Sequence, residues 1–122
     1  MDDLQPKQER TEPYPRTLYL VGTPIGNLGD LSPRAKCILK NVSLIACEDT
    51  RRGGKLLKTI ESKVPLLSYH KHNFKSRLIK LLSILENNGS VALISDAGLP
   101  GISDPGEELV RASKSNNHEV IC

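Results

Sequence analysis

Aromatic residues are scarce in this chain of 122 residues: they make up 3% of it, and tryptophan is absent. Because the interior must then be filled by other apolar side chains, we expect an aliphatic core. Long apolar runs are missing too, and none approaches the roughly 20 residues that a membrane-spanning helix needs. With 38% hydrophobic and 25% charged residues, the composition is typical of one soluble globular domain.

Cysteine is also rare, and Cys37, Cys47 and Cys122 have no spacing that metal sites use. An odd number of cysteines in apolar surroundings fits a chain kept reduced in a cytosolic compartment. The net charge of +3 is weak evidence for a polyanionic partner, because many enzymes with neutral substrates are as basic. The amino terminus is acidic and has no hydrophobic region, so we expect neither a secretory signal nor a typical transit peptide.

Hydrophobic patterning predicts a polar arm followed by alternating strands and helices. Residues 1–16 are polar, contain three prolines and lack periodicity, so we expect a disordered arm. The expected strands are 18–21, 44–47, 65–69, 91–94 and one beginning at 119, and the expected helices are 33–42, 51–60, 74–86 and 105–115. This alternation predicts an α/β fold: a three-layer sandwich around a mostly parallel five-stranded sheet within residues 17–122.

Several helix boundaries carry recognisable signals. Ser32 is placed to cap a helix that starts at Pro33, and Asn73 and Asp104 are placed to cap two later helices. Gly53 and Gly54 weaken the helix expected over 51–60. They suggest mobility there or a late helix start near residue 55.

Three loops, after Val21, Cys47 and Ile94, collect glycine, proline and acidic residues where predicted strands end. The carboxyl ends of parallel strands lie along one edge, where open α/β sheets bind ligands, so we expect one cleft there. The loop 22–29 has three glycines but neither dinucleotide nor P-loop spacing. It could also be a tight strand-to-helix turn. The loop 95–106 is unusually long and rich in glycine and proline, which favours a ligand loop over an ordinary connection.

Charged and imidazole side chains follow two of these strands. Glu48, Asp49 and Arg51 could cap a helix, pair with one another or line a site. His70 and His72 would share one face of an extended segment. No third ligand stands at a suitable spacing, so a metal site is disfavoured, and the histidines are expected in a cleft or at its rim.

Four motifs stand here in the order found in one known family: 18–28 (LYLVGTPIGNL), 48–51 (EDTR), 70–73 (HKHN) and 95–106 (SDAGLPGISDPG). In these motifs the chain resembles the amino-terminal domain of the ribosomal RNA small subunit methyltransferase I family, part of the tetrapyrrole-methylase superfamily. The resemblance covers about residues 17–122 and is highly specific.

The resemblance implies a reaction and its partners. The family transfers a methyl group from S-adenosylmethionine to the 2′-oxygen of a cytidine ribose in small-subunit (16S) rRNA. The implied partner is that rRNA or the 30S subunit, and the full-length enzyme is expected to be a homodimer. The implied location is a bacterial cytoplasm or an organelle of bacterial origin, with no membrane association.

The resemblance also assigns residues to roles. The cofactor is expected against two loops, largely through their backbone, at Gly22, Thr23, Pro24, Ile25, Gly26, Asn27, Asp96, Ala97, Gly98, Leu99 and Pro100. Glu48, Asp49 and Arg51 are expected near the acceptor ribose. Glu48 or Asp49 could accept the ribose proton, and His70 is a third candidate. Phosphates of the rRNA could be contacted by the basic residues Arg51, Arg52, Lys75, Arg77 and Lys80.

One departure from the family matters for activity. The family continues with a carboxy-terminal domain that supplies the other wall of the cofactor cleft, whereas this sequence stops at Cys122. We therefore expect these residues alone to bind the cofactor weakly and to show little or no activity. The alternatives are a precorrin or uroporphyrinogen methylase domain, whose glycine-rich first loop usually differs, and a non-catalytic remnant that acts as a binding module.

Overall fold

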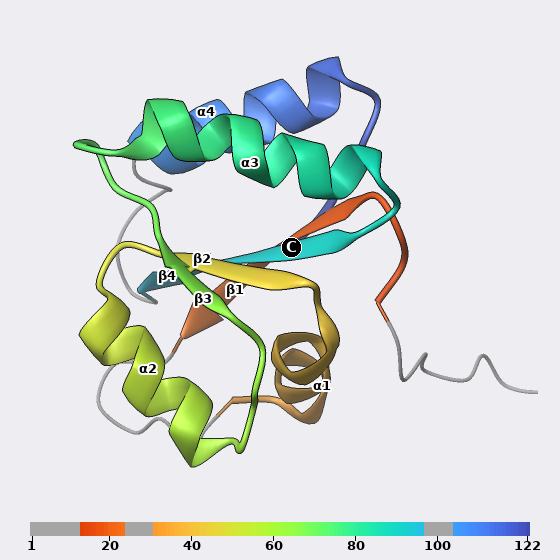
Figure 1. The fold of residues 1–122 in the computed structure, drawn as a ribbon. Helices are drawn as coiled ribbons and strands as arrows, with labels where there is room; N and C mark the ends of the chain where they lie inside the picture. The colour runs from red at the N-terminus through yellow and green to blue at the C-terminus, as the bar shows by residue number, and fades with distance from the viewer. Residues whose placement is uncertain (1–12, 24–30, 97–103) are drawn as a thin grey trace, which may run out of the picture.

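A computed structural model describes residues 13–23, 31–96 and 104–122, which form a parallel sheet between two pairs of helices (Figure 1). The elements are β1 (Thr17–Thr23), α1 (Pro33–Asn41), β2 (Leu44–Cys47), α2 (Thr50–Thr59), β3 (Leu66–Ser68), α3 (Phe74–Glu86), β4 (Ser90–Asp96), α4 (Asp104–Ser115) and β5 (Glu119–Ile121). The five strands pair in parallel in the order β3-β2-β4-β1-β5. The predicted three-layer α/β fold is confirmed. Within the described residues, no helix is long and apolar enough to cross a membrane.

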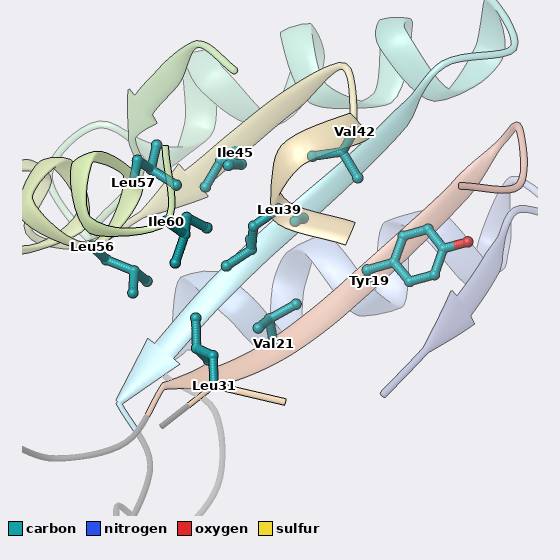
Figure 2. Close-up of a cluster of buried hydrophobic side chains, with 10 residues drawn as sticks. Tyr19, Val21, Leu31, Leu39, Val42, Ile45, Leu56, Leu57 and Ile60 are labelled. Atoms are coloured by element: carbon teal, nitrogen blue, oxygen red, sulfur yellow. The ribbon is translucent and has the colours of Figure 1, made fainter. Parts of the chain in front are cut away.

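Two buried clusters fill the two sides of the sheet. One joins β1 and β2 to α1 and α2 through residues such as Leu39, Leu56 and Leu57 (Figure 2). The other joins the strands to α3 and α4 through residues that include Leu81 and Leu109. The core is aliphatic apart from two buried tyrosines and Cys47, so the expectation drawn from the lack of aromatics is confirmed.

Helix boundaries agree with the sequence signals at some places and not at others. The Ser32 hydroxyl accepts a hydrogen bond from the Ala35 N–H at 3.1 Å, which confirms the predicted cap of α1. Asn73 is the N-cap residue of α3, as predicted, although its side chain makes no capping hydrogen bond to the helix. Helix α4 begins at Asp104, whose side chain lies outside the described part of the chain.

Helix α2 begins at Thr50, so the late start suggested by its glycines is wrong. The Asp49 carboxylate accepts hydrogen bonds from the N–H groups of Arg51 and Arg52 at 3.0 and 3.3 Å and fixes the first turn. Gly53 is required by packing instead: a Cβ there would lie 2.8 Å from the Cys47 sulfur. A Cβ at Gly54 would meet nothing within 4 Å.

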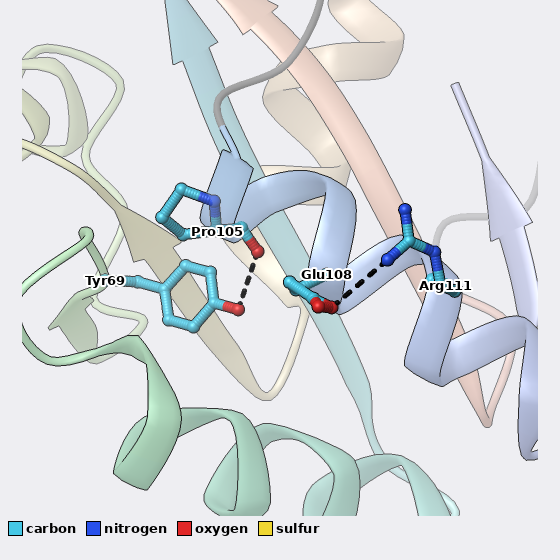
Figure 3. A network of polar contacts seen from close by, with 4 residues as sticks. All are labelled: Tyr69, Pro105, Glu108 and Arg111. Carbon is cyan, nitrogen blue, oxygen red and sulfur yellow. Dashed lines mark hydrogen bonds and ion pairs between the residues drawn. The ribbon is translucent and has the colours of Figure 1, made fainter.

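Tyr69, which directly follows β3, ties that strand to the start of α4. Its hydroxyl donates a hydrogen bond to the Pro105 carbonyl oxygen at 2.8 Å (Figure 3). Its ring meets Phe74 edge to face, with centroids 6.4 Å apart. Burial, with a smaller contribution from the Glu108 carboxylate, raises the pKa of Tyr69 to about 12. This contact therefore holds the start of α4 to the end of β3.

The two neighbouring glycines of α2 predict opposite effects of the same substitution. Gly54→Ala should raise the free energy of unfolding by about 0.5–1 kcal/mol, because alanine favours a helix and nothing obstructs its methyl group. Gly53→Ala should lower it by about 1–3 kcal/mol, because the methyl group overlaps Cys47 and Leu66. Urea unfolding measures both values, and equal effects of the two variants would contradict this packing argument.

Tyr69→Phe should lower the free energy of unfolding by about 1–2 kcal/mol at neutral pH, because the buried Pro105 carbonyl loses its donor. The folded protein holds the phenol proton more tightly than the unfolded chain, whose tyrosine pKa is near 10. The wild type should therefore keep this contribution below pH 10 and lose it as the pH rises toward about 12. Between pH 10 and about 12, the free energy of unfolding should fall less steeply with pH for Tyr69→Phe than for the wild type. Identical slopes for the two proteins would contradict the raised pKa of Tyr69.

Candidate functional site

Strand register brings four strand ends to one edge of the sheet. A single register row contains Val21 of β1, Ile94 of β4, Cys47 of β2 and Ser68 of β3. For each of these strands, a polar or charged residue stands two positions after the residue of this row: Thr23, Asp96, Asp49 and His70. The structure therefore places candidates from all four sequence motifs along the same edge.

The ends of β1 and β4 meet at a topological switch point. The two strands pair up to Thr23 and Asp96, and the Thr23 hydroxyl donates a hydrogen bond to the Ser95 carbonyl oxygen at 3.2 Å. The chain leaves β1 toward α1 on one face of the sheet and leaves β4 toward α4 on the other (Figure 1). Such a divergence opens a crevice beyond the carboxyl ends of the strands, which is where α/β sheets bind ligands.

Gly22 lies exposed beside this switch point. A Cβ built on it would meet nothing within 4 Å, so the protein's own packing does not demand glycine here. Gly22 also lines a cavity of about 240 Å³ between the ends of β1 and β5 and the first turns of α1, with Ser32, Arg34 and Ile121 among the other lining residues. The volume is below the range of about 300–1,000 Å³ typical of sites that enclose a small ligand.

The charged residues after β2 are all exposed, and one of them has a structural role. Asp49 is the N-cap of α2, so one of its carboxylate oxygens is already engaged by two backbone N–H groups. Glu48 and Arg51 are exposed on either side of it. Asp49 therefore has a role in holding the helix whether or not it also meets a substrate.

Cys47, at the end of β2, is not a reactive thiol. Its Sγ donates a hydrogen bond to the Asp49 carbonyl oxygen at 3.5 Å, and the residue is buried. Burial, followed by the nearby Asp49 carboxylate, raises the pKa of Cys47 to about 11. The thiol is protonated at neutral pH, which excludes a nucleophilic role there.

His70 and His72 lie where the chain turns between β3 and α3, and not on an extended segment. The His72 N–H donates to the Nδ1 of His70 at 3.1 Å, and the two rings meet edge to face with centroids 5.7 Å apart. The Asn73 carboxamide oxygen accepts from the His70 N–H at 2.8 Å, which closes the turn. In the described part of the chain, no three His, Cys, Asp or Glu residues are placed to hold a metal ion.

Sequence reasoning missed a polar network beneath His70. The Asn73 amide donates to the Ser68 hydroxyl at 3.1 Å and contacts the Nε2 of His70 at 3.2 Å. The half-buried Arg77 guanidinium donates to the Ser68 carbonyl oxygen at 2.7 Å and also to the Ser68 hydroxyl. Arg77, expected to contact phosphate, instead fixes the end of β3. The sequence carried little signal for this, because Arg77 lies about half a turn from Lys75 but on nearly the same side of the helix as Lys80.

Several predicted cofactor contacts lie outside the described residues: Pro24, Ile25, Gly26, Asn27, Ala97, Gly98, Leu99 and Pro100. The structure describes Gly22 and Thr23 at the start of the first loop. At the second loop it describes the backbone of Asp96, where β4 ends.

Comparison with known proteins agrees with the motifs. The chain is 57% identical over 104 residues to a ribosomal RNA small subunit methyltransferase I of Synechocystis sp., a match that covers 85% of this chain and 37% of that protein. It is 52% identical over 103 residues to the protein of that name from Mycoplasmopsis pulmonis (84% and 46%), and 53% identical over 94 residues to that from Bacillus subtilis (77% and 32%). The chain thus spans less than half the length of these relatives.

The fold is also found in a solved structure. A cobalamin biosynthetic enzyme, cobalt precorrin-4 methyltransferase, superimposes with a TM-score of 0.69 at 15% identity, over 87% of this chain and 45% of that one. At this identity the likeness shows the fold alone. The family model for tetrapyrrole (corrin/porphyrin) methylases matches residues 17–122. The resemblance drawn from the four motifs is confirmed: the chain belongs to the tetrapyrrole methylase family.

Proposed function

We propose that this chain forms the amino-terminal domain of an S-adenosylmethionine-dependent methyltransferase acting on the 2′-oxygen of a cytidine ribose in small-subunit rRNA. The observation that carries the proposal is the gathering of Gly22, Asp96, Asp49 and His70 at one sheet edge in a chain closely similar to proteins named for this rRNA activity. The proposal includes a cytoplasmic or organellar location and the homodimer that the resemblance implies.

The residues at the switch point fit a cofactor that is contacted mainly by backbone. When bound, S-adenosylmethionine supplies an already activated methyl group, so the protein has chiefly to orient the reactants. Gly22 leaves open space for close approach, and Thr23 ties the end of β1 to β4 through the Ser95 carbonyl oxygen. Residues 24–27 and 97–100 complete the proposed contacts. The cavity of about 240 Å³ would hold only part of such a cofactor, so these residues form one wall of the site.

Three side chains are candidates for the proton acceptor that a weakly nucleophilic ribose hydroxyl needs. Glu48 and Asp49 are both exposed, but one carboxylate oxygen of Asp49 already accepts the hydrogen bonds that cap α2. His70 stands at the end of the neighbouring strand, with its ring positioned by contacts from His72 and Asn73. We favour Glu48 or His70 as the acceptor, with Arg51 providing positive charge beside the ribose.

The tetrapyrrole alternative has weaker support. The cobalt precorrin-4 methyltransferase is 15% identical and therefore supports the fold alone, whereas relatives at 52–57% identity carry rRNA methyltransferase names. A binding module without catalysis can be distinguished from a methyltransferase domain by experiment, because the binding module would not need to bind S-adenosylmethionine.

A chimera tests the proposed activity. Residues 17–122 would replace the matching segment of the full-length Synechocystis relative, and purified 30S subunits would be incubated with it and labelled S-adenosylmethionine. We expect labelled 2′-O-methylcytidine, with turnover reduced about 100-fold or more by the variant that removes the proton acceptor, Glu48→Gln or His70→Gln. Lys40→Gln serves as the exposed control that leaves turnover unchanged. Label in a different nucleoside would contradict the proposed substrate.

Gly22→Ala tests the cofactor wall in the chain itself. Isothermal titration should give a dissociation constant for S-adenosylmethionine weaker than micromolar, because the cavity is small. The added methyl group should weaken binding by a further factor of about ten, about 1.4 kcal/mol, without lowering the melting temperature. Gly54→Ala, whose methyl group also meets open space, is the matched control and should bind like the wild type. Equal affinities for all three proteins would contradict the placement of the cofactor at Gly22.

A further inference from the structure

Charge is distributed very unevenly along this chain. Residues 50–85 contain nine lysines and arginines and a single acidic residue, Glu61, while the other 86 residues contain eight basic and thirteen acidic residues. The small net charge of +3 therefore conceals a strongly basic segment. This segment comprises β3, which is an edge strand of the sheet, and the helices α2 and α3, which cover the two opposite faces of the sheet beside it (Figure 1).

Part of this basic segment lies beside the candidate site. Helices α2 and α3 both start from the carboxyl ends of adjacent strands, β2 and β3. Four exposed cations occur in these starts and form what we call the basic rim: Arg51 and Arg52 in the first turn of α2, Lys71 in the turn after β3, and Lys75 in the first turn of α3. The rim thus flanks Asp49 and His70.

The four cations of the rim stand beside two carboxylates, Glu48 and Asp49, so positive charge is in excess there. The neighbouring carboxylate of Asp49 is engaged by backbone N–H groups of α2, while Glu48 is the other acidic residue next to it in sequence. Arg77 is not counted in the rim, because its half-buried guanidinium bonds to Ser68. Through this bond it orders the start of the turn that carries Lys71. Farther from the site, exposed Lys55 and Lys80 continue the positive charge along the two helices.

We infer that the basic rim binds the phosphates of an RNA strand and so delivers a ribose to the site from the β3 side of the sheet; this inference rests on the proposed function. Lysine and arginine contacts to phosphate position a nucleic acid without reading its sequence. Cations presented from three successive elements suit a chain of phosphates better than a single small anion. RNA reaching the site across this edge would place its backbone over α2 and α3 and its target ribose near Glu48 and His70.

The test neutralises two lysines of the rim in the 122-residue chain and measures binding of a labelled single-stranded RNA by fluorescence anisotropy at several salt concentrations. Lys71→Gln/Lys75→Gln should weaken binding about tenfold and reduce the steepness of the salt dependence by about 1.4, since each phosphate contact contributes about 0.7. The matched control is Lys40→Gln/Lys114→Gln, because these exposed lysines lie in the last turns of α1 and α4, at the opposite edge of the sheet.

The outcomes separate this inference from the proposed function. A loss confined to the rim variant, with the control unchanged, supports the inference. Equal losses in both variants, or no binding of RNA by the wild type, overturn it. The chimera assay tests the proposed function separately: absence of labelled 2′-O-methylcytidine would contradict that function even where the rim-specific loss of RNA affinity stands. Thermal unfolding of each variant confirms that the compared proteins are folded.

Discussion

The insertion of β4 between β1 and β2 is the constraint on which the candidate site depends. Although β4 comes late in the chain, it pairs with β1 over seven residues and with β2 over four. Val91 and Ala92 are fully buried within it, so it is held from both faces as well as both edges. Because β1 and β4 pair up to their last residues but lead to helices on opposite faces, their carboxyl ends form a topological switch point, where open α/β sheets bind ligands.

Polar contacts fix the chain along the edge of the sheet where the strands end. Asp49 fixes the start of α2, Thr23 joins the ends of β1 and β4, and Tyr69 holds the start of α4 to the end of β3. Each contact uses a backbone group as donor or acceptor at a point where the chain leaves the sheet. The site residues are therefore positioned by backbone geometry, which suits the glycine- and proline-rich composition of the adjoining loops.

Local features of the fold could be predicted from the sequence, and long-range ones could not. The strand 44–47 and the Ser32 cap depend on residues close in sequence, and the structure confirms both. The strand order depends on pairings between distant segments that carry no local signal. Gly53 was misinterpreted for the same reason: its requirement comes from Cys47 and Leu66, which only the folded chain brings near. Asn73 occupies the predicted N-cap position of α3, but its side chain bonds to His70 and Ser68, and these contacts could not be predicted from the sequence.

The claim that the strand ends form one ligand-binding edge is tested most directly by nuclear magnetic resonance. Backbone amide shifts of the labelled chain would be followed as S-adenosylmethionine is added. The account predicts that the shifts concentrate at Gly22, Thr23 and Ser95, with smaller changes after Cys47, while amides at the opposite edge, such as Ser43 and Asn117, stay in place. Shifts confined to the opposite edge, or none at Gly22 and Ser95 when the cofactor is in excess, would contradict it.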